Sequence, residues 1–158
     1  MNIFSLHDNP RISAQYHNDK HVVKMITETA QILSTVHHNH DEWKKEFYKP
    51  AFYKHPSVLW AGETKANYQW LVRLGLSLYD EYKFRYGQDR THKAGEKIAN
   101  VLFTPPTTIK DKPRTKFSMA MPDEYKNDNP IKAYRDYYMG DKRHLASWKV
   151  RGVPTWWK

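Results

Sequence analysis

The stretch NDKHVVKMITETAQILSTV, residues 18–36, decides the fold. It predicts one long helix, because its apolar residues recur every three or four positions and form a single stripe. That stripe consists of Val22, Ile26, Ala30 and Leu33. Asn18 is a suitable N-cap for this helix.

A second side of the same helix carries polar groups. His21 and Glu28 lie seven residues apart, which is two helical turns, and Lys24 precedes Glu28 by four residues. Two interpretations remain open from this stretch alone. The polar groups can line a cleft, or they can form a solvated face with one Lys–Glu pair.

The rest of the chain also predicts helices. The strongest signal covers residues 57–87, with a possible break at Gly62 and a C-cap at Gly87. Shorter helices are expected over 91–103, from the Asn129-Pro130 pair to about 139, and over 141–148 after Asp141, with a helical turn at 11–16.

Long loops and an absence of strands complete the prediction. Prolines punctuate residues 41–56 and 104–130, which we expect to be loops, and no run of β-branched residues alternates as a strand does. We therefore predict an all-α fold, a compact single domain over residues 1–158 with four to five helices and long connecting loops.

Composition indicates the kind of partner. The chain has 26 Lys plus Arg against 17 Asp plus Glu, a net charge of +9, and 15% of its residues are aromatic. Positive charge interleaved with rings suits phosphate contacts and base stacking, so nucleic acid is the first expected partner and an anionic membrane the second. No apolar run could span a membrane and no signal peptide is visible, so we expect a cytoplasmic protein.

Several kinds of catalytic site are excluded. The chain has no cysteine, which rules out disulfides and thiolate chemistry, and it has no glycine-rich phosphate loop and no HExxH motif. His17 and His21 have the i, i+4 spacing that can hold zinc, with Glu28 on the same line, but no second cluster of ligands follows. We expect no metal, no cofactor and a monomeric chain.

The remaining groups suit an enzyme that acts on a base within DNA. Such an enzyme extrudes a nucleotide and holds it by stacking and positive charge. Cleavage of the glycosidic bond then needs a carboxylate to stabilise the cationic sugar, and a nucleophile at C1′. An α-amine is the better amine nucleophile at neutral pH, because its reference pKa is about 7.7–8.0 against about 10.4 for lysine.

The sequence resembles the pyrimidine-dimer DNA glycosylases, the small helical repair enzymes of the endonuclease V type. Asp19-Lys20-His21 followed by Glu28 is similar to the Asp-x-His and catalytic Glu of that family, at the same interval. Residues 55–87 resemble its long central helix, and the ending PTWWK resembles its Pro-Thr-Trp-Tyr-Lys tail. The chain also resembles a group of uncharacterised phage proteins that share the DKHVVKM, NYQWL, MPDEYK and AYRDYY stretches, which would place it in a host cytoplasm.

The resemblance implies roles for particular residues. Glu28 would be the catalytic carboxylate and His21 a neighbour of the substrate. The nucleophile of the family is the α-amine of a threonine exposed by removal of the initiator Met, but Asn2 is bulky here, so Met1 would be retained and would supply the amine. The arginines that flank the family's Glu are absent, and Lys24 is the nearest substitute.

The leading hypothesis is therefore a base-excision N-glycosylase and AP-lyase-like enzyme that acts on damaged or modified pyrimidines. Its catalytic residues would be Met1, Glu28 and His21. Its substrate-binding residues would be Asn2, Lys20, Lys24, Asn67, Arg85, His92, Lys93 and Trp156. Three alternatives stay open: a phage enzyme that modifies pyrimidine nucleotides or hypermodified bases without strand cleavage, a non-catalytic nucleic-acid-binding protein, and a metal-dependent enzyme.

Overall fold

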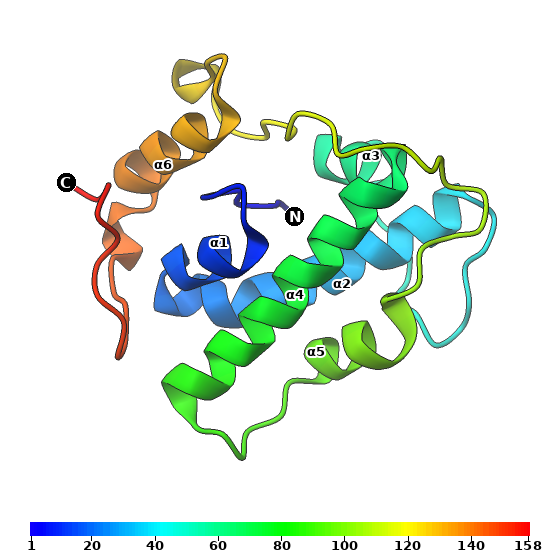
Figure 1. Ribbon diagram of the computed structural model, residues 1–158, viewed down its shortest axis with the longest axis horizontal. Helices are drawn as coiled ribbons and strands as arrows, with labels where there is room; N and C mark the ends of the chain where they lie inside the picture. Colours follow the sequence, from blue (N-terminus) through cyan, green and yellow to red (C-terminus); the bar gives the residue numbers. More distant parts are fainter.

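Two long helices cross at the centre of the molecule, α2 (Asp19–Asn39) and α4 (Lys65–Tyr86) (Figure 1). The computed structural model describes all of residues 1–158. Each long helix begins at a side-chain cap, since the side chain of Asn18 accepts a hydrogen bond from the backbone N–H of His21 and that of Thr64 accepts one from Asn67. Local sequence signals therefore set where both central helices start.

A glycine allows close packing at this crossing. A Cβ atom on Gly75 of α4 would lie 2.9 Å from Thr29 Cγ2 of α2 and 2.7 Å from Ile98 Cδ1. Both distances are shorter than real Cβ contacts, so only glycine fits between these two neighbours.

Shorter elements surround the central pair. They are α1 (Pro10–Tyr16), α3 (Pro56–Glu63), α5 (Lys93–Lys97) with the π-helical turn η1 (Ile98–Leu102), the 3₁₀ turn η2 (Asp123–Tyr125), α6 (Pro130–Asp141) and the 3₁₀ turn η3 (Arg143–Leu145). The predicted all-α class and the long loops are confirmed. The α-helices number six rather than four or five, and the break in the second long helix falls at Thr64 rather than at Gly62.

The helix predicted over residues 141–148 is wrong. Asp141 ends α6, and only one 3₁₀ turn follows. The reason is tertiary, because Asp19 holds this segment extended: its backbone N–H donates to the carbonyl of Ser147, and its carboxylate accepts from the backbone N–H of Lys149. Those bonds take the place of helical ones.

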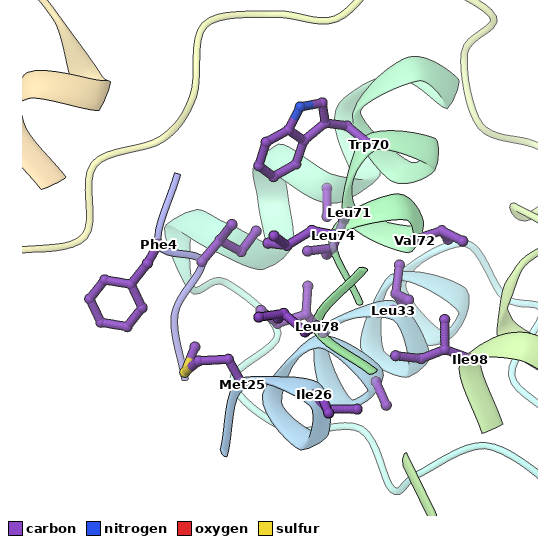
Figure 2. Close-up of a cluster of buried hydrophobic side chains, with 14 of the residues drawn as sticks. Phe4, Met25, Ile26, Leu33, Trp70, Leu71, Val72, Leu74, Leu78 and Ile98 are labelled. Atoms are coloured by element: carbon purple, nitrogen blue, oxygen red, sulfur yellow. The ribbon is translucent and has the colours of Figure 1, made fainter. Parts of the chain in front are cut away.

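The apolar core lies between α2, α4 and the N-terminal segment (Figure 2). The predicted stripe of α2 is confirmed, since all four of its side chains are fully buried. The facing side of α4 contributes Leu71, Leu74 and Leu78. Burial of each such leucine stabilises the fold by roughly 1.5–3 kcal/mol.

The N-terminal segment, residues 1–9, runs through the middle of the molecule between α6 and the central helices (Figure 1). The ring of Phe4 fixes it there, with centroids 5.3 Å from Tyr138 of α6 and 4.6 Å from His21 of α2. The Nε of Arg135 also donates to the carbonyl of Leu6. The chain's first residues are thus an interior element rather than a loose tail.

None of the helices combines the length and hydropathy that a membrane span requires.

Candidate active site

A cavity of about 260 Å³ opens where the N-terminal segment meets α2 and α6. Larger hollows occur elsewhere on the molecule, but this one gathers an amine, a carboxylate, imidazoles and lysines around a small volume. Its lining consists of Met1, Asn2, Phe4, His21, Lys24, Glu28, His55, Ala120, Tyr137 and Lys142.

The amine and the carboxylate form an ion pair. The backbone nitrogen of Met1 lies 2.8 Å from Oε1 of Glu28, and the side chains of Met1 and Glu28 are only 4% and 11% exposed. The other carboxylate oxygen lies 3.8 Å from Nζ of Lys24, whose side chain is 69% exposed. The ammonium is therefore held inside the cavity by Glu28, whereas Lys24 reaches the carboxylate from solvent.

The Asn2 side chain fixes the position of the amine. Its Nδ2 donates to the carbonyl of Ala120 at 2.9 Å, and its Oδ1 accepts from the hydroxyls of Tyr134 at 3.0 Å and Ser57 at 3.4 Å. These partners belong to three separate parts of the chain, the 104–129 loop, α6 and α3. Asn2 lines the cavity, as the sequence predicted, but its polar atoms are engaged with the protein.

His21 is the second titratable group of the cavity. Burial, reinforced by the positive charges of Lys142 and Lys24, lowers its pKa to about 3, so it is neutral near pH 7. Its Nδ1 lies 2.7 Å from the hydroxyl of Tyr138, which also accepts from the backbone N–H of Asn18.

This hydrogen-bond pattern assigns the tautomer of His21. The hydroxyl of Tyr138 is fully buried, and its proton has no other acceptor than Nδ1 of His21. The arrangement that satisfies both groups leaves the imidazole proton on Nε2 of His21, which has no protein partner. His21 therefore presents a neutral N–H donor to the cavity.

His55 forms part of the opposite wall. Its Nδ1 accepts from the backbone N–H of Ser57 and caps α3. Burial, followed by the nearby positive charge of the N-terminus, lowers its pKa. Both imidazoles of the cavity are thus neutral neighbours of the Met1–Glu28 pair.

The wall formed by α6 carries a ring and a cation. The ring of Tyr137 is stacked on Phe4, with centroids 6.1 Å apart, and Nζ of Lys142 lies 5.2 Å from the Tyr137 centroid. Sequence reasoning missed Tyr137 and Lys142, as well as Phe4, His55 and Ala120. Only the aromatic run at Tyr134, Tyr137 and Tyr138 gave a signal, and it did not show that α6 returns to the N-terminus.

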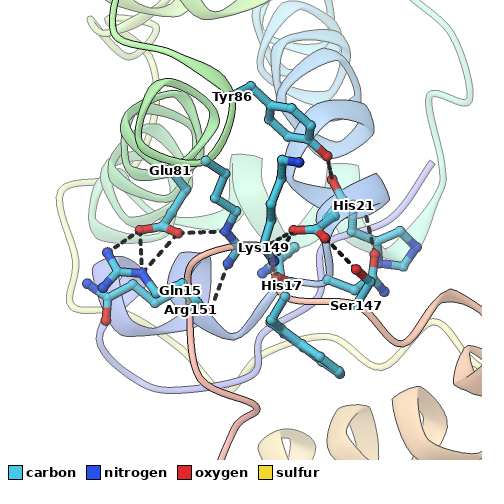
Figure 3. A network of polar contacts seen from close by, with 12 residues as sticks. Gln15, His17, His21, Glu81, Tyr86, Ser147, Lys149 and Arg151 are labelled. Atoms are coloured by element: carbon cyan, nitrogen blue, oxygen red, sulfur yellow. Dashed lines mark hydrogen bonds and ion pairs between the residues drawn. The ribbon is translucent and has the colours of Figure 1, made fainter.

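Arg85 lies outside this cavity. Its side chain is fully buried, its Nε donates to Glu81 at 2.9 Å, and its Nη1 donates to Asp19 at 3.1 Å. Glu81 also pairs with Arg151, at 2.6 Å (Figure 3). This network joins α2, α4 and the C-terminal segment, and every charge in it is engaged by another protein group.

The other predicted binding residues are also separate from the cavity. Asn67 is buried and bonded to Trp60 and Thr115. His92 occupies the N-cap position of α5 without a side-chain capping bond, and its Nε2 lies 3.1 Å from the carbonyl of Val23. Lys20 and Lys93 are exposed, and Trp156 packs on Tyr16 and Tyr138.

The pair with zinc-ligand spacing makes other contacts. His17 is fully buried, and its Nδ1 donates to the carbonyl of Ser13, while His21 is bonded to Tyr138. No group of three or more His, Cys, Asp or Glu side chains is arranged to hold a metal ion.

Comparison with known proteins identifies the family. The family model of the pyrimidine dimer DNA glycosylases matches residues 1–94, which include α1 to α4, Met1, His21 and Glu28. No curated protein and no solved structure matches the chain. The resemblance predicted from the sequence is confirmed, and the chain belongs to the pyrimidine dimer DNA glycosylase family.

Proposed function

We propose that the protein is a DNA glycosylase with lyase activity that acts on pyrimidine dimers, and that the amine of Met1 is its nucleophile. The observation that carries this proposal is the contact between the Met1 nitrogen and Glu28 inside a small cavity. An amine in contact with a carboxylate is the pair that imine-forming cleavage of a glycosidic bond requires.

The reaction follows from that pair. Glu28 takes a proton from the Met1 ammonium, and the freed lone pair of the amine forms a bond to C1′ of the nucleotide. The bond between C1′ and the base breaks at the same carbon, its electron pair leaves with the base, and the base takes up a second proton from the Met1 nitrogen. Glu28 then returns its proton to the ring oxygen of the sugar, the ring opens, and an imine joins Met1 to the DNA.

The remaining groups have supporting roles. The free N–H of His21 is placed to donate to a substrate oxygen as negative charge develops on it. Lys24 and Lys142 line the cavity and give it positive charge that suits the phosphates on either side of the nucleotide. The net charge of +9 favours DNA binding by the molecule as a whole.

Borohydride trapping tests the mechanism. The protein is mixed with ultraviolet-irradiated duplex DNA and sodium borohydride, which reduces an imine to a stable secondary amine. We expect one covalent adduct, absent with unirradiated DNA, whose peptide map places the DNA on the α-nitrogen of Met1. Acetylation of that nitrogen should abolish the adduct. Absence of an adduct while DNA is still cut, or an adduct on a lysine, would contradict the role of Met1.

A second candidate is modification of a pyrimidine base or nucleotide without strand cleavage. It is favoured by the cavity wall formed by Ala120, Tyr137 and Lys142, because these residues lie outside the region that the family model matches. This candidate predicts turnover of free pyrimidine nucleotides and indifference to acetylation of Met1. Mass spectrometry of nucleotides and DNA after incubation separates the two reactions.

A further inference from the structure

The loop between α2 and α3 presents a large ring to solvent on unusual backbone. Phe52 is 67% exposed, and its φ of 54° lies in the left-handed region that bulky residues rarely adopt. Strained backbone of this kind persists only where surrounding structure imposes it, and it is concentrated at functional sites.

Helix α2 imposes this conformation from both sides of Phe52. On one side, the hydroxyl of Thr35 lies 3.2 Å from the backbone nitrogen of Ala51 and 3.3 Å from its carbonyl oxygen. On the other side, Nδ2 of Asn39 donates to the carbonyl of Tyr53 at 2.9 Å. The ring of Phe52 is therefore carried on a fixed piece of backbone, although it is itself exposed.

Phe52 lies beside the cavity. The backbone N–H of His55 donates to the carbonyl of Phe52 at 2.9 Å, which closes a four-residue turn. The Cα atoms at the ends of such a turn are less than about 7 Å apart. Because His55 lines the cavity, the Phe52 backbone lies within one turn of the cavity wall.

Other exposed rings of this loop have partners within the protein, and Phe52 has no ring partner. Tyr53 is stacked on His38, with centroids 4.8 Å apart, and Nε1 of Trp43 donates to the carbonyl of Tyr48. The charges next to Phe52 are positive, since Lys54 and Lys49 are exposed and neither is in an ion pair. An unpaired ring between lysines suits a stack of bases flanked by phosphates.

We propose that Phe52 is a wedge that inserts into the base stack of duplex DNA beside the nucleotide that enters the cavity. This inference rests on the proposed function, because a wedge is needed only if a nucleotide leaves the duplex. Insertion of the ring replaces the stacking that the neighbouring base pair loses, and the fixed backbone avoids ordering the loop on binding.

The test uses variants that preserve the backbone. Phe52→Asn removes the ring and tolerates the left-handed conformation, so it should fold as well as the natural chain. Phe52→Trp keeps a ring at the same position. The matched control is Phe103→Asn, which removes a ring that is 53% exposed, does not line the cavity and lies on ordinary helical backbone.

Each variant is made in a Glu28→Gln background, so that binding is measured without turnover. The probe is a duplex that contains one thymine dimer flanked by 2-aminopurine, whose fluorescence rises when it is unstacked. We expect Phe52→Asn to lose most of that rise and to bind the duplex about tenfold more weakly, while its affinity for the same single strand changes less than twofold. Phe52→Trp and Phe103→Asn should keep the fluorescence rise.

Three results would count against the wedge. They are an undiminished fluorescence rise with Phe52→Asn, an equal loss of affinity for single-stranded DNA, and the same loss with Phe103→Asn. Failure of the proposed function is distinguishable. Unstacking of the probe that depends on Phe52, without a borohydride adduct, would support the wedge and contradict the imine mechanism. Absence of binding to dimer-containing duplex would contradict both proposals.

Discussion

The amino nitrogen of Met1 and the carboxylate of Glu28 meet at 2.8 Å although they belong to different elements, the N-terminal segment and α2. At this separation the two groups need no rearrangement to exchange a proton. Their preorganisation rests on the packing of Phe4 and the hydrogen bonds of Asn2. Changes at the carboxylate and at this support should therefore have different effects.

Glu28→Gln should lower the rate of adduct formation by about 10²–10⁴, because the amide keeps the shape of the side chain but cannot take a proton. Binding of dimer-containing duplex should change little. Single-turnover trapping and fluorescence anisotropy measure the two quantities. Full trapping activity in Glu28→Gln would remove this residue from the mechanism.

Asn2→Leu should weaken both stability and trapping. Leucine is similar in size and is still bulky enough for Met1 to be retained, but it cannot bond to Ala120, Tyr134 or Ser57. We expect a loss of about 1–3 kcal/mol in the free energy of unfolding and at least a tenfold slower adduct formation from a misplaced amine. Urea denaturation measures the free energy of unfolding, and borohydride trapping measures the rate of adduct formation. Asn100→Leu, at an exposed position, is the control.

Arg85→Met should act on stability rather than on DNA contacts. It leaves the carboxylates of Asp19 and Glu81 without their buried cation, which typically costs about 3–5 kcal/mol. The salt dependence of DNA binding by the folded protein should not change, because the Arg85 side chain is fully buried. Lys93→Ala, at an exposed lysine, should leave stability unchanged. A shallower salt slope with Arg85→Met would instead indicate a phosphate contact.

Acid should destabilise the protein through two buried histidines. Burial lowers the pKa of His17 to about 4 and that of His21 to about 3, from an ordinary value of 6.5. At a pH between its folded-state pKa and 6.5, each histidine is protonated in the unfolded chain but not in the folded chain. The free energy of unfolding is therefore highest above about pH 6.5 and falls as the pH decreases. At pH 5 the loss should be about 2 kcal/mol for each histidine.

Denaturation curves at pH 7 and pH 5 measure this loss, and His17→Gln should reduce it by about 2 kcal/mol. An equal loss in His17→Gln would assign the acid sensitivity to other groups.

Gly75→Ala should destabilise the fold by about 1–3 kcal/mol, although alanine normally favours a helix. Its Cβ would meet Ile98 and Thr29 at distances that force one of them to move. Gly62→Ala is the matched control, because the Cβ there would lie 3.4 Å from the nearest atom, a side-chain carbon of Val36. Thermal melts should show a lower midpoint for Gly75→Ala and no such decrease for Gly62→Ala.

Local sequence signals were sufficient to predict the central helix α2 and the start of α6. The apolar stripe of α2, its cap at Asn18 and the Asn129-Pro130 start of α6 are all properties of adjacent residues, and the structure confirms them. The segment after Asp141 was mispredicted because its conformation is set by Asp19, which is distant in the sequence.

In the candidate site, too, residues that share one helix could be predicted, and residues brought in by distant segments could not. Met1, His21, Lys24 and Glu28 share one cavity, and three of them could be placed on one helix from their spacing. Tyr137 and Lys142 could not be found in this way, because they reach the cavity only through the packing of α6 against the first residues. Arg85 was predicted to bind the substrate, since a sequence does not show that a guanidinium has buried carboxylate partners.

The cavity wall that α6 supplies has a consequence for biosynthesis. Met1 and Glu28 are translated before Lys142, so the cavity that they line is complete only after Lys142 has been added. Until then the chain would carry the amine that we propose as the nucleophile without the α6 wall of the cavity. We therefore expect this cavity to form late in folding, when α6 docks onto residues 1–9.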